Sequence, residues 1–259
     1  MQKTLTWALI CFPSQNLNRA LRMKDLGVVD SVSATRQHAN YCKQLSRFGF
    51  SLLTLPSDTR YPDSVFVEDP AVIIEDTLII TRLRRKERIG EEERIKTILL
   101  PFFDKVSSIT APGFIEGGDV LIAKQHLYVG LSKRTNIEGA NQLAEIARNL
   151  FGYPTTIFKI PESYLHLKGE ATYHPSSDTI TVSEEIADHF RDSSSRLIVT
   201  PSNERFGANC ISSKNAILIH KGRVKTKKLL RDLGFDVLEI DLSEFEKVDG
   251  AMTCLSKLF

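Results

Sequence analysis

Hydrophobic and polar positions recur along this chain in one order: a pair of short apolar strands, an amphipathic helix and a further strand. The order occurs five times, with a period of roughly 40 to 55 residues that is typical of repeat architectures. We therefore expect an α/β fold of five pseudo-symmetric ββαβ units around a central channel. Four of the closing strands end at an X-Pro step and the fifth ends at Ile240-Asp241. These four steps are Leu55-Pro56, Ala111-Pro112, Ile160-Pro161 and Thr200-Pro201.

Five segments have the spacing of an amphipathic helix. In residues 34–48, for example, Tyr41, Leu45 and Phe48 recur at intervals of three or four, so that one stripe can face a sheet. Gly49 then stands where a helix commonly ends. The expected helices are residues 34–48, 91–103, 135–151, 184–190 and 224–233.

Short apolar runs between these segments predict the strands. The final run, residues 251–258, has no helix after it, and we expect it to complete the first unit and close the ring. Because no Pro- or Gly-rich linker interrupts the series, residues 1–259 are expected to form a single catalytic domain. The other expected strands are residues 6–12, 50–55, 65–67, 72–74, 78–81, 106–109, 120–123, 127–129, 156–160, 171–173, 179–182, 196–199, 208–211, 216–219 and 236–240.

Composition narrows the class of protein. The 259 residues are 42% hydrophobic and 25% charged, as in ordinary globular proteins, and the net charge of +2 gives no electrostatic argument for a nucleic acid or membrane partner. Apolar runs fall far short of the roughly 20 residues that span a bilayer, and no signal peptide is evident. The four cysteines (Cys11, Cys42, Cys210 and Cys254) lack metal-type spacing, which predicts free thiols in a reducing cytoplasm.

Acidic residues interrupt the pattern at the edges of two units. Asp63 lies among loop residues, and Glu68 and Asp69 follow an apolar run, with Pro70 forcing an extended or turning backbone at Asp69. Glu116-Gly117-Gly118-Asp119 opens another unit, where paired glycines let the backbone turn tightly or approach a ligand. Each motif, taken alone, is more often a plain surface turn.

A histidine and a cysteine lie at comparable edges of other units. His166 and Cys254, taken singly, would more often be a structural histidine and a small buried hydrophobe. Together with the acids they suggest chemistry: a thiol needs a base or a cation to become a thiolate, a histidine can carry that proton, and a carboxylate fixes the histidine tautomer. Further carboxylates suit a planar cation such as guanidinium, which pairs with them bidentately. The pattern predicts nucleophilic attack on a guanidinium carbon.

A set of motifs along nearly the whole chain resembles the dimethylarginine dimethylaminohydrolase family. The resemblance implies the guanidino-group-modifying superfamily, its pentein fold (a five-bladed α/β propeller of ββαβ units), and catalysis without a metal or organic cofactor. The motifs are Pro62-Asp63-Ser64-Val65-Phe66-Val67-Glu68-Asp69, Glu116-Gly117-Gly118-Asp119-Val120, Gly130-Leu131-Ser132-Lys133-Arg134-Thr135-Asn136, Leu165-His166-Leu167-Lys168, Ala208-Asn209-Cys210-Ile211, and Val248-Asp249-Gly250 with Thr253-Cys254.

The resemblance also implies roles for single residues near the reacting carbon. Cys254 would be the nucleophile, His166 the general acid and base, and Glu116 the carboxylate that orients His166. The residues expected to hold the guanidinium side of the substrate are Asp63, Glu68 and Asp69.

Other residues would bind the amino-acid end of the substrate. Arg134 matches an arginine that binds the carboxylate, Val248 matches a backbone contact to the α-amino group, and Leu17 falls where the family has a lid contact. For a second arginine the family has Gly-x-x-Ser-Arg-Arg, which this chain lacks. Counting from Arg82 selects Arg88, with Arg84 and Arg85 as alternatives.

The activity implied is hydrolysis of a small guanidino substrate, asymmetric dimethylarginine or monomethylarginine. The products would be citrulline and dimethylamine or methylamine, formed through a covalent Cys thiouronium. The alternatives are an arginine deiminase that releases ammonia, an amidinotransferase, and a non-catalytic pentein such as the ribosome anti-association factor. A homodimer is compatible with all of these.

Overall fold

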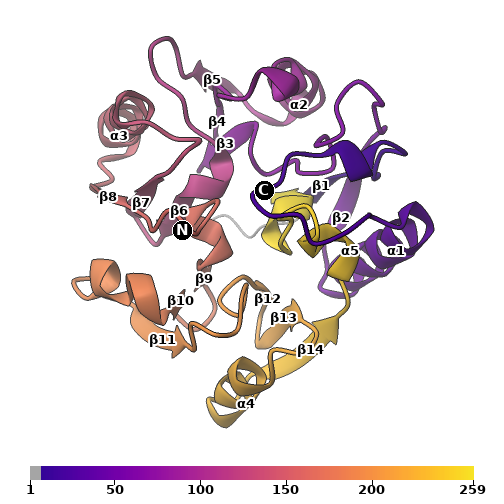
Figure 1. The fold of residues 1–259 in the computed structure, drawn as a ribbon. Coiled ribbons are helices and arrows are strands. Elements are labelled where there is room, and N and C mark those ends of the chain that lie inside the picture. Colours follow the sequence, from indigo (N-terminus) through magenta and orange to yellow (C-terminus); the bar gives the residue numbers. More distant parts are fainter. Residues whose placement is uncertain (1–6) are drawn as a thin grey trace.

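The computed structural model describes residues 7–259, and it contains five three-stranded sheets arranged around a common centre (Figure 1). In every sheet the middle strand pairs antiparallel with one neighbour and parallel with the other. The predicted five ββαβ units are therefore present. In sheet order the strands are β15 (Ser256–Leu258), β1 (Trp7–Cys11) and β2 (Ser51–Leu55); β3 (Ala71–Ile74), β4 (Thr77–Ile80) and β5 (Lys105–Ser108); β6 (Val120–Ala123), β7 (His126–Leu131) and β8 (Thr155–Lys159); β9 (Ala171–His174), β10 (Thr179–Ser183) and β11 (Arg196–Thr200); and β12 (Ile211–Ser213), β13 (Ala216–His220) and β14 (Asp236–Ile240).

A helix connects the two parallel strands of each unit, because a parallel pair needs a crossover. Figure 1 shows α1 to α4 at the periphery, with β3, β6, β9 and β12 nearest the centre. The crossover helices are α1 (Ser31–Arg47), α2 (Glu91–Leu99), α3 (Ile137–Phe151), η6 (Glu184–Phe190) and α4 (Val224–Asp232). The remaining helical segments are α5 (Ser243–Glu246) and the short 3-10 turns η1 (Leu17–Arg19), η2 (Lys86–Arg88), η3 (Leu100–Phe102), η4 (Gly117–Asp119), η5 (Leu167–Gly169) and η7 (Thr253–Leu255).

Capping residues set the boundaries of the two longest helices. The Asp30 side chain accepts a hydrogen bond from the backbone of Val32, so α1 begins three residues earlier than the apolar spacing predicted. Asn136 caps α3 in the same way, which moves its start from residue 135 to Ile137. Gly152, with φ of 71°, ends α3 in the left-handed conformation.

Several predicted elements differ in the structure. Residues 65–67 form turns rather than a strand: their side chains are all buried, and the Phe66 N–H donates to the Asp63 carbonyl at 2.9 Å. The strand expected at 208–211 begins only at Ile211, since the Asn209 N–H donates within its own loop to Phe206. Residues 184–190 form a 3-10 helix, and the short helix α5 was not predicted. Residue 6 of the first predicted strand lies outside the described residues.

The chain closes the ring between its two ends. As predicted, the last segment completes the first unit, although only residues 256–258 of the expected strand 251–258 form β15, and residues 253–255 form η7. β15 pairs antiparallel with β1, and Trp7 and Phe259 exchange backbone hydrogen bonds of 2.8 and 3.0 Å. Tyr41 of α1 is fully buried and donates to the Met252 carbonyl at 2.9 Å, with Ser256 Oγ 2.7 Å away. These contacts hold the turn that carries Cys254 from both sides.

Two further predictions concern the chain as a whole. All four cysteines are free thiols. Within residues 7–259, no helix combines the length and apolar character that crossing a membrane would require.

Candidate active site

Five of the predicted site residues lie at equivalent places in four units, in the segment just before the first strand of the sheet. Glu68 and Asp69 precede β3, Glu116 precedes η4 and β6, His166 precedes η5 and β9, and Cys254 lies in η7 before β15. Because these strands lie nearest the centre (Figure 1), the segments before them converge there. The repeat therefore brings together residues that are up to 186 positions apart, from Glu68 to Cys254.

His166 lies between two carboxylates. Its Nε2 is 2.9 Å from Glu116 Oε2, and its Nδ1 is 3.8 Å from Asp69 Oδ1. All three side chains are buried. Burial alone would lower the pKa of His166, but the carboxylates of Asp69, Asp119 and Glu116 outweigh burial and raise the pKa to about 9. The imidazole is therefore a cation at neutral pH.

Cys254 lies beside the same acids in a largely apolar cluster. Its carbonyl accepts a hydrogen bond from the Glu68 N–H at 3.4 Å. Burial, and then the negative charges of Glu68 and Asp69, raise the pKa of the thiol well above its ordinary value. In the free protein the thiol is neutral, and a cation bound near Glu68 and Asp69 would lower its pKa.

Two buried arginines form ion pairs with Asp69 and Glu116. Arg88 is buried: its Nη1 donates to Asp69 at 2.7 Å, and its Nη2 donates to Glu91 at 2.8 Å. Arg134 is also buried and donates to Glu116 Oε1 at 3.1 Å. Sequence reasoning did not predict the contact with Glu91, because Arg88 ends η2 and Glu91 begins α2, with the left-handed Gly90 between them.

Asp63, Leu17 and Val248 lie in or near the loop that connects β1 with α1. The Asp63 carboxylate accepts hydrogen bonds of 3.2 and 3.3 Å from the backbone of Leu21. Leu17 and Val248 are buried in the same apolar cluster as Cys254. Asp249, next to Val248, accepts from the Met23 N–H and from Arg205. Two buried acids thus hold the loop in place.

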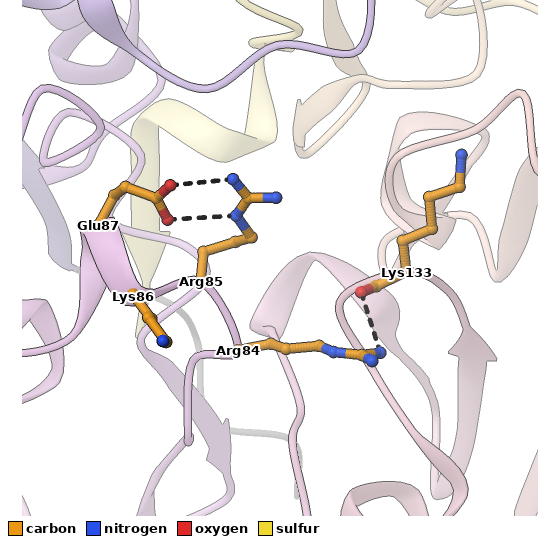
Figure 2. Close-up of a pocket in the computed structure, with 5 residues that line it drawn as sticks. All are labelled: Arg84, Arg85, Lys86, Glu87 and Lys133. Atoms are coloured by element: carbon orange, nitrogen blue, oxygen red, sulfur yellow. Dashed lines mark hydrogen bonds and ion pairs between the residues drawn. The ribbon is translucent and has the colours of Figure 1, made fainter.

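A cationic pocket of about 440 Å³ is lined by residues that directly precede Arg88 and Arg134 in the sequence. Figure 2 shows Arg85 paired with Glu87 on one side and Arg84 reaching to the Lys133 carbonyl on the other. Lys86 completes the lining. Four cations and one acid make this pocket attractive to an anion.

Sequence reasoning assigned no role to a group of polar residues behind the acids. Lys168 forms an ion pair with Glu68 Oε1, and Thr253 Oγ1 donates to Glu68 Oε2 at 2.8 Å. Asn209 contacts both Lys168 and Thr253. The signal was their position, since each belongs to one of the motifs on which the family resemblance rests, and those of Lys168 and Thr253 also contain a predicted site residue.

Asp119 connects several segments of the site, which the sequence did not indicate. Its carboxylate accepts hydrogen bonds from Ser132 and Thr135, both at 2.7 Å, and from the N–H of Leu167 at 3.1 Å. Thr135 Oγ1 also accepts from the Glu116 N–H at 3.1 Å. Burial raises the pKa of Asp119 to about 6. This buried carboxylate joins the segments that carry His166, Glu116 and Arg134.

The acids and the histidine could in principle surround a cation. Asp69, Glu116 and His166 each offer a ligand atom within 4.8 Å of the other two. Both carboxylates, however, already receive hydrogen bonds from guanidinium groups of the protein, Arg88 and Arg134. These ion pairs leave the two carboxylates less free to coordinate a metal ion.

Sequence comparison identifies relatives of the whole chain. A family model described as arginine deiminase matches residues 59–189, just over half of the chain. N(G),N(G)-dimethylarginine dimethylaminohydrolase of Pseudomonas aeruginosa is 35% identical over 249 residues, which cover 95% of this chain and 96% of that protein. The protein of the same name from Streptomyces coelicolor is 32% identical and covers 88% of this chain and 86% of its own length.

Solved structures show the same relationship at the level of the fold. The Pseudomonas aeruginosa enzyme, as a cysteine-to-serine mutant complexed with citrulline, superposes with a TM-score of 0.91 at 33% identity over 99% of this chain and 100% of that one. The N-terminal domain of ArgZ, an arginine dihydrolase from cyanobacteria, shares the fold with a TM-score of 0.84 at 20% identity, covering 97% of this chain and 96% of its own. The predicted pentein fold is thereby confirmed, and the chain belongs to the dimethylarginine dimethylaminohydrolase family.

Proposed function

We propose that this protein hydrolyses the guanidinium group of Nω-methylated arginines, asymmetric dimethylarginine and monomethylarginine. The products are citrulline and dimethylamine or methylamine. The observation that carries the proposal is the buried pair of His166 and Glu116, with Asp69 beside it, at the centre onto which the Cys254 turn also converges. The family relationship supports it, because the relatives are dimethylarginine dimethylaminohydrolases and one was solved with citrulline.

The first half of the reaction forms a covalent intermediate. The substrate cation binds beside Glu68 and Asp69 and lowers the pKa of the Cys254 thiol, whose proton leaves to solvent. The thiolate attacks the guanidinium carbon, and the imidazolium of His166 donates its proton to the departing amine as the C–N bond breaks. A thiouronium remains on Cys254.

The second half releases the product. Neutral His166 takes a proton from water, and the resulting hydroxide adds to the thiouronium carbon. The hydroxyl proton is then lost to solvent, the C–S bond breaks, and citrulline leaves while the thiolate is regenerated. Glu116 holds the imidazole in one orientation and stabilises its charged form. No cofactor takes part in these steps.

At the other end of the substrate, we place the carboxylate on Arg134 and Arg85. Arg88, chosen by counting along the sequence, is buried with its donors directed to Asp69, Glu91 and the Phe66 carbonyl, whereas Arg85 is paired only with the exposed Glu87, which a substrate carboxylate could replace. Arg85 lines the cationic pocket next to Lys133, the neighbour of Arg134 (Figure 2). Val248 and Leu17 keep the roles that the resemblance implies, at the α-amino group and the covering loop.

The decisive experiment measures citrulline formation from asymmetric dimethylarginine, monomethylarginine and arginine side by side. We expect turnover of the methylated substrates and nearly complete loss in Cys254→Ser and in His166→Ala. Cys42→Ser is the matched control, because Cys42 is a half-buried thiol of α1 outside the site. Citrulline formation at the wild-type rate by Cys254→Ser or His166→Ala would remove that residue from the mechanism.

An arginine deiminase is the second candidate, because the matching family model carries that description. Release of ammonia from arginine, without amine release from methylated substrates, would favour it. An amidinotransferase would instead need an amino acceptor. A non-catalytic pentein would have no use for the Cys, His and Glu set, and thiol reagents would not then distinguish Cys254 from the other cysteines.

The domain organisation, cellular location and partners of the protein are proposed from the sequence. We propose one catalytic domain, residues 1–259, acting in the cytoplasm on a small molecule, without nucleic acid or membrane partners. A homodimer is compatible with this activity, since all of the proposed site residues belong to one chain.

A further inference from the structure

The fifth unit also has a polar residue at the position that the site residues occupy in the other four. Asn209 stands just before β12, as Glu68 and Asp69 stand before β3 and His166 before η5 and β9. Its side chain is fully buried. We propose that Asn209 is a positioning residue that holds Glu68 and the Cys254 turn in place through the hydroxyl of Thr253. This inference rests on the function proposed above.

The orientation of the Asn209 amide is set by two backbone groups. Its Nδ2 donates to the Lys168 carbonyl at 2.6 Å, and its Oδ1 accepts from the Thr253 N–H at 3.1 Å. A carbonyl can only accept and an N–H can only donate, so the amide cannot be reversed. Asn209 therefore connects the residue before Cys254 with a residue two positions after His166.

The amide also sets the direction of the Thr253 hydroxyl. Asn209 Nδ2 donates to Thr253 Oγ1 at 3.0 Å, so the hydroxyl accepts on this side and its single proton is free to point elsewhere. That proton is donated to Glu68 Oε2 at 2.8 Å. Lys168 pairs with the other oxygen of Glu68. Asn209, Thr253 and Lys168 thus fix the carboxylate that is to hold the substrate beside Cys254.

Asn209→Asp tests this chain of hydrogen bonds, because aspartate has the same size as asparagine but lacks its donor. An aspartate cannot donate to the Lys168 carbonyl, and it would accept the Thr253 proton that Glu68 now receives. We expect kcat/KM for asymmetric dimethylarginine to fall about 10- to 100-fold, the range for loss of a positioned hydrogen bond to a charged group. Labelling of Cys254 by 2-chloroacetamidine, a cationic thiol reagent, should slow in parallel. Asn215→Asp is the control, because Asn215 lies in the same unit and its side chain donates to the Gly234 carbonyl at the surface, away from the site.

Thr253 variants test the same chain if Asn209→Asp fails to fold. Thr253→Val removes the hydroxyl at nearly constant shape and should cause a loss of similar size. Thr253→Ser retains the hydroxyl and should restore most of the activity. Both residues act through one hydrogen-bond chain. The double variant Asn209→Asp/Thr253→Val should therefore lose no more kcat/KM than the more impaired of the two single variants.

Three outcomes would overturn the inference. The first is a folded Asn209→Asp variant with wild-type kcat/KM and labelling rate. The second is a Thr253→Val variant with wild-type kcat/KM and labelling rate. The third is a double variant whose fold-loss in kcat/KM equals the product of the two single fold-losses. If the wild-type protein does not turn over methylarginines at all, the proposed function fails instead. The labelling rates of the variants then still test whether Asn209 positions the Cys254 turn.

Discussion

At the scale of single residues, His166 links the chemistry of the site to its stability. Asp69, Asp119 and Glu116 face the imidazole and raise its pKa from the ordinary 6.5 to about 9 in the folded protein. A group whose pKa is raised on folding adds stability that is complete below its unfolded pKa and is lost as the pH rises through the folded value. The stabilising contribution of His166 is therefore present below pH 6.5 and disappears toward pH 9.

This predicts how the stability depends on pH. Between pH 6.5 and 9, the free energy of unfolding of the wild-type protein should fall by a contribution on the order of 3 kcal/mol. Urea unfolding at a series of pH values measures it. His166→Gln keeps a polar side chain that does not titrate, so it should show a flatter profile. Parallel profiles for the two proteins would show that His166 is not charged in the folded state.

Arg88 gives a second prediction at this scale. Replacing it by methionine would leave buried carboxylates of Asp69 and Glu91 without their partner, which typically costs about 3–5 kcal/mol. Arg85→Met is the matched control: the Arg85–Glu87 pair is exposed, and exposed pairs contribute about 0–1 kcal/mol. Chemical denaturation compares the two. Equally small losses would mean that Arg88 does not compensate the acids.

At the scale of elements, the paired glycines of η4 let two units approach each other. A Cβ on Gly117 would lie 2.2 Å from the Glu68 carbonyl oxygen, and one on Gly118 would lie 2.7 Å from His166 Nδ1. The sequence suggested a tight turn or a close approach here. The structure shows that the approach is to another unit of the same chain.

We therefore expect Gly118→Ala to displace the imidazole and to reduce kcat strongly, while the sheets still form. Gly169→Ala, in the neighbouring η5, is the control, since its Cβ would make only an ordinary contact of 3.5 Å with Phe206. Citrulline assays and circular dichroism on both variants test this. Unchanged turnover in Gly118→Ala would show that His166 can shift without consequence.

The elements differ in how far they could be predicted. The helix near residues 34–48 was predictable because buried residues recur along one face of α1. Residues 65–67 were not, because a fully buried apolar run has no alternation that separates a strand from a buried turn. Cys254 and His166 could be proposed from the sequence because residue type and motif single out a candidate nucleophile and a candidate base. The Asn209–Thr253–Glu68 connection joins three units, and no local pattern reports a contact between units.

At the scale of the whole molecule, ring closure depends on the packing of the last strand. Phe259 is buried and contacts Phe102 and Phe103 of the second unit, with ring centroids 5.4 and 5.6 Å apart. Phe259→Ala should cost about 3–5 kcal/mol, as for other buried phenylalanines. Phe12→Ala is the control, because Phe12 is 48% exposed. Thermal unfolding measures both, and a loss no greater in Phe259→Ala than in Phe12→Ala would contradict the prediction.

Removing residues 256–259 is the stronger test of ring closure. It retains Cys254 but deletes β15 and its pairing with β1. We expect citrulline formation to be lost, because the turn that carries the nucleophile would no longer be held at the centre. Retained activity would show that Tyr41 and the apolar cluster suffice to place Cys254.

The pairing of β1 with β15 also has a consequence for biosynthesis. During synthesis β1 finds its partner only when residues 256–258 have left the ribosome, so of the five units the one that contains β1 is completed last. Such a long-range contact is entropically expensive and slow to form. A nascent chain that stalls before residue 254 lacks the proposed nucleophile, so the proposed activity can arise only after the segment that carries Cys254 and β15 has been made.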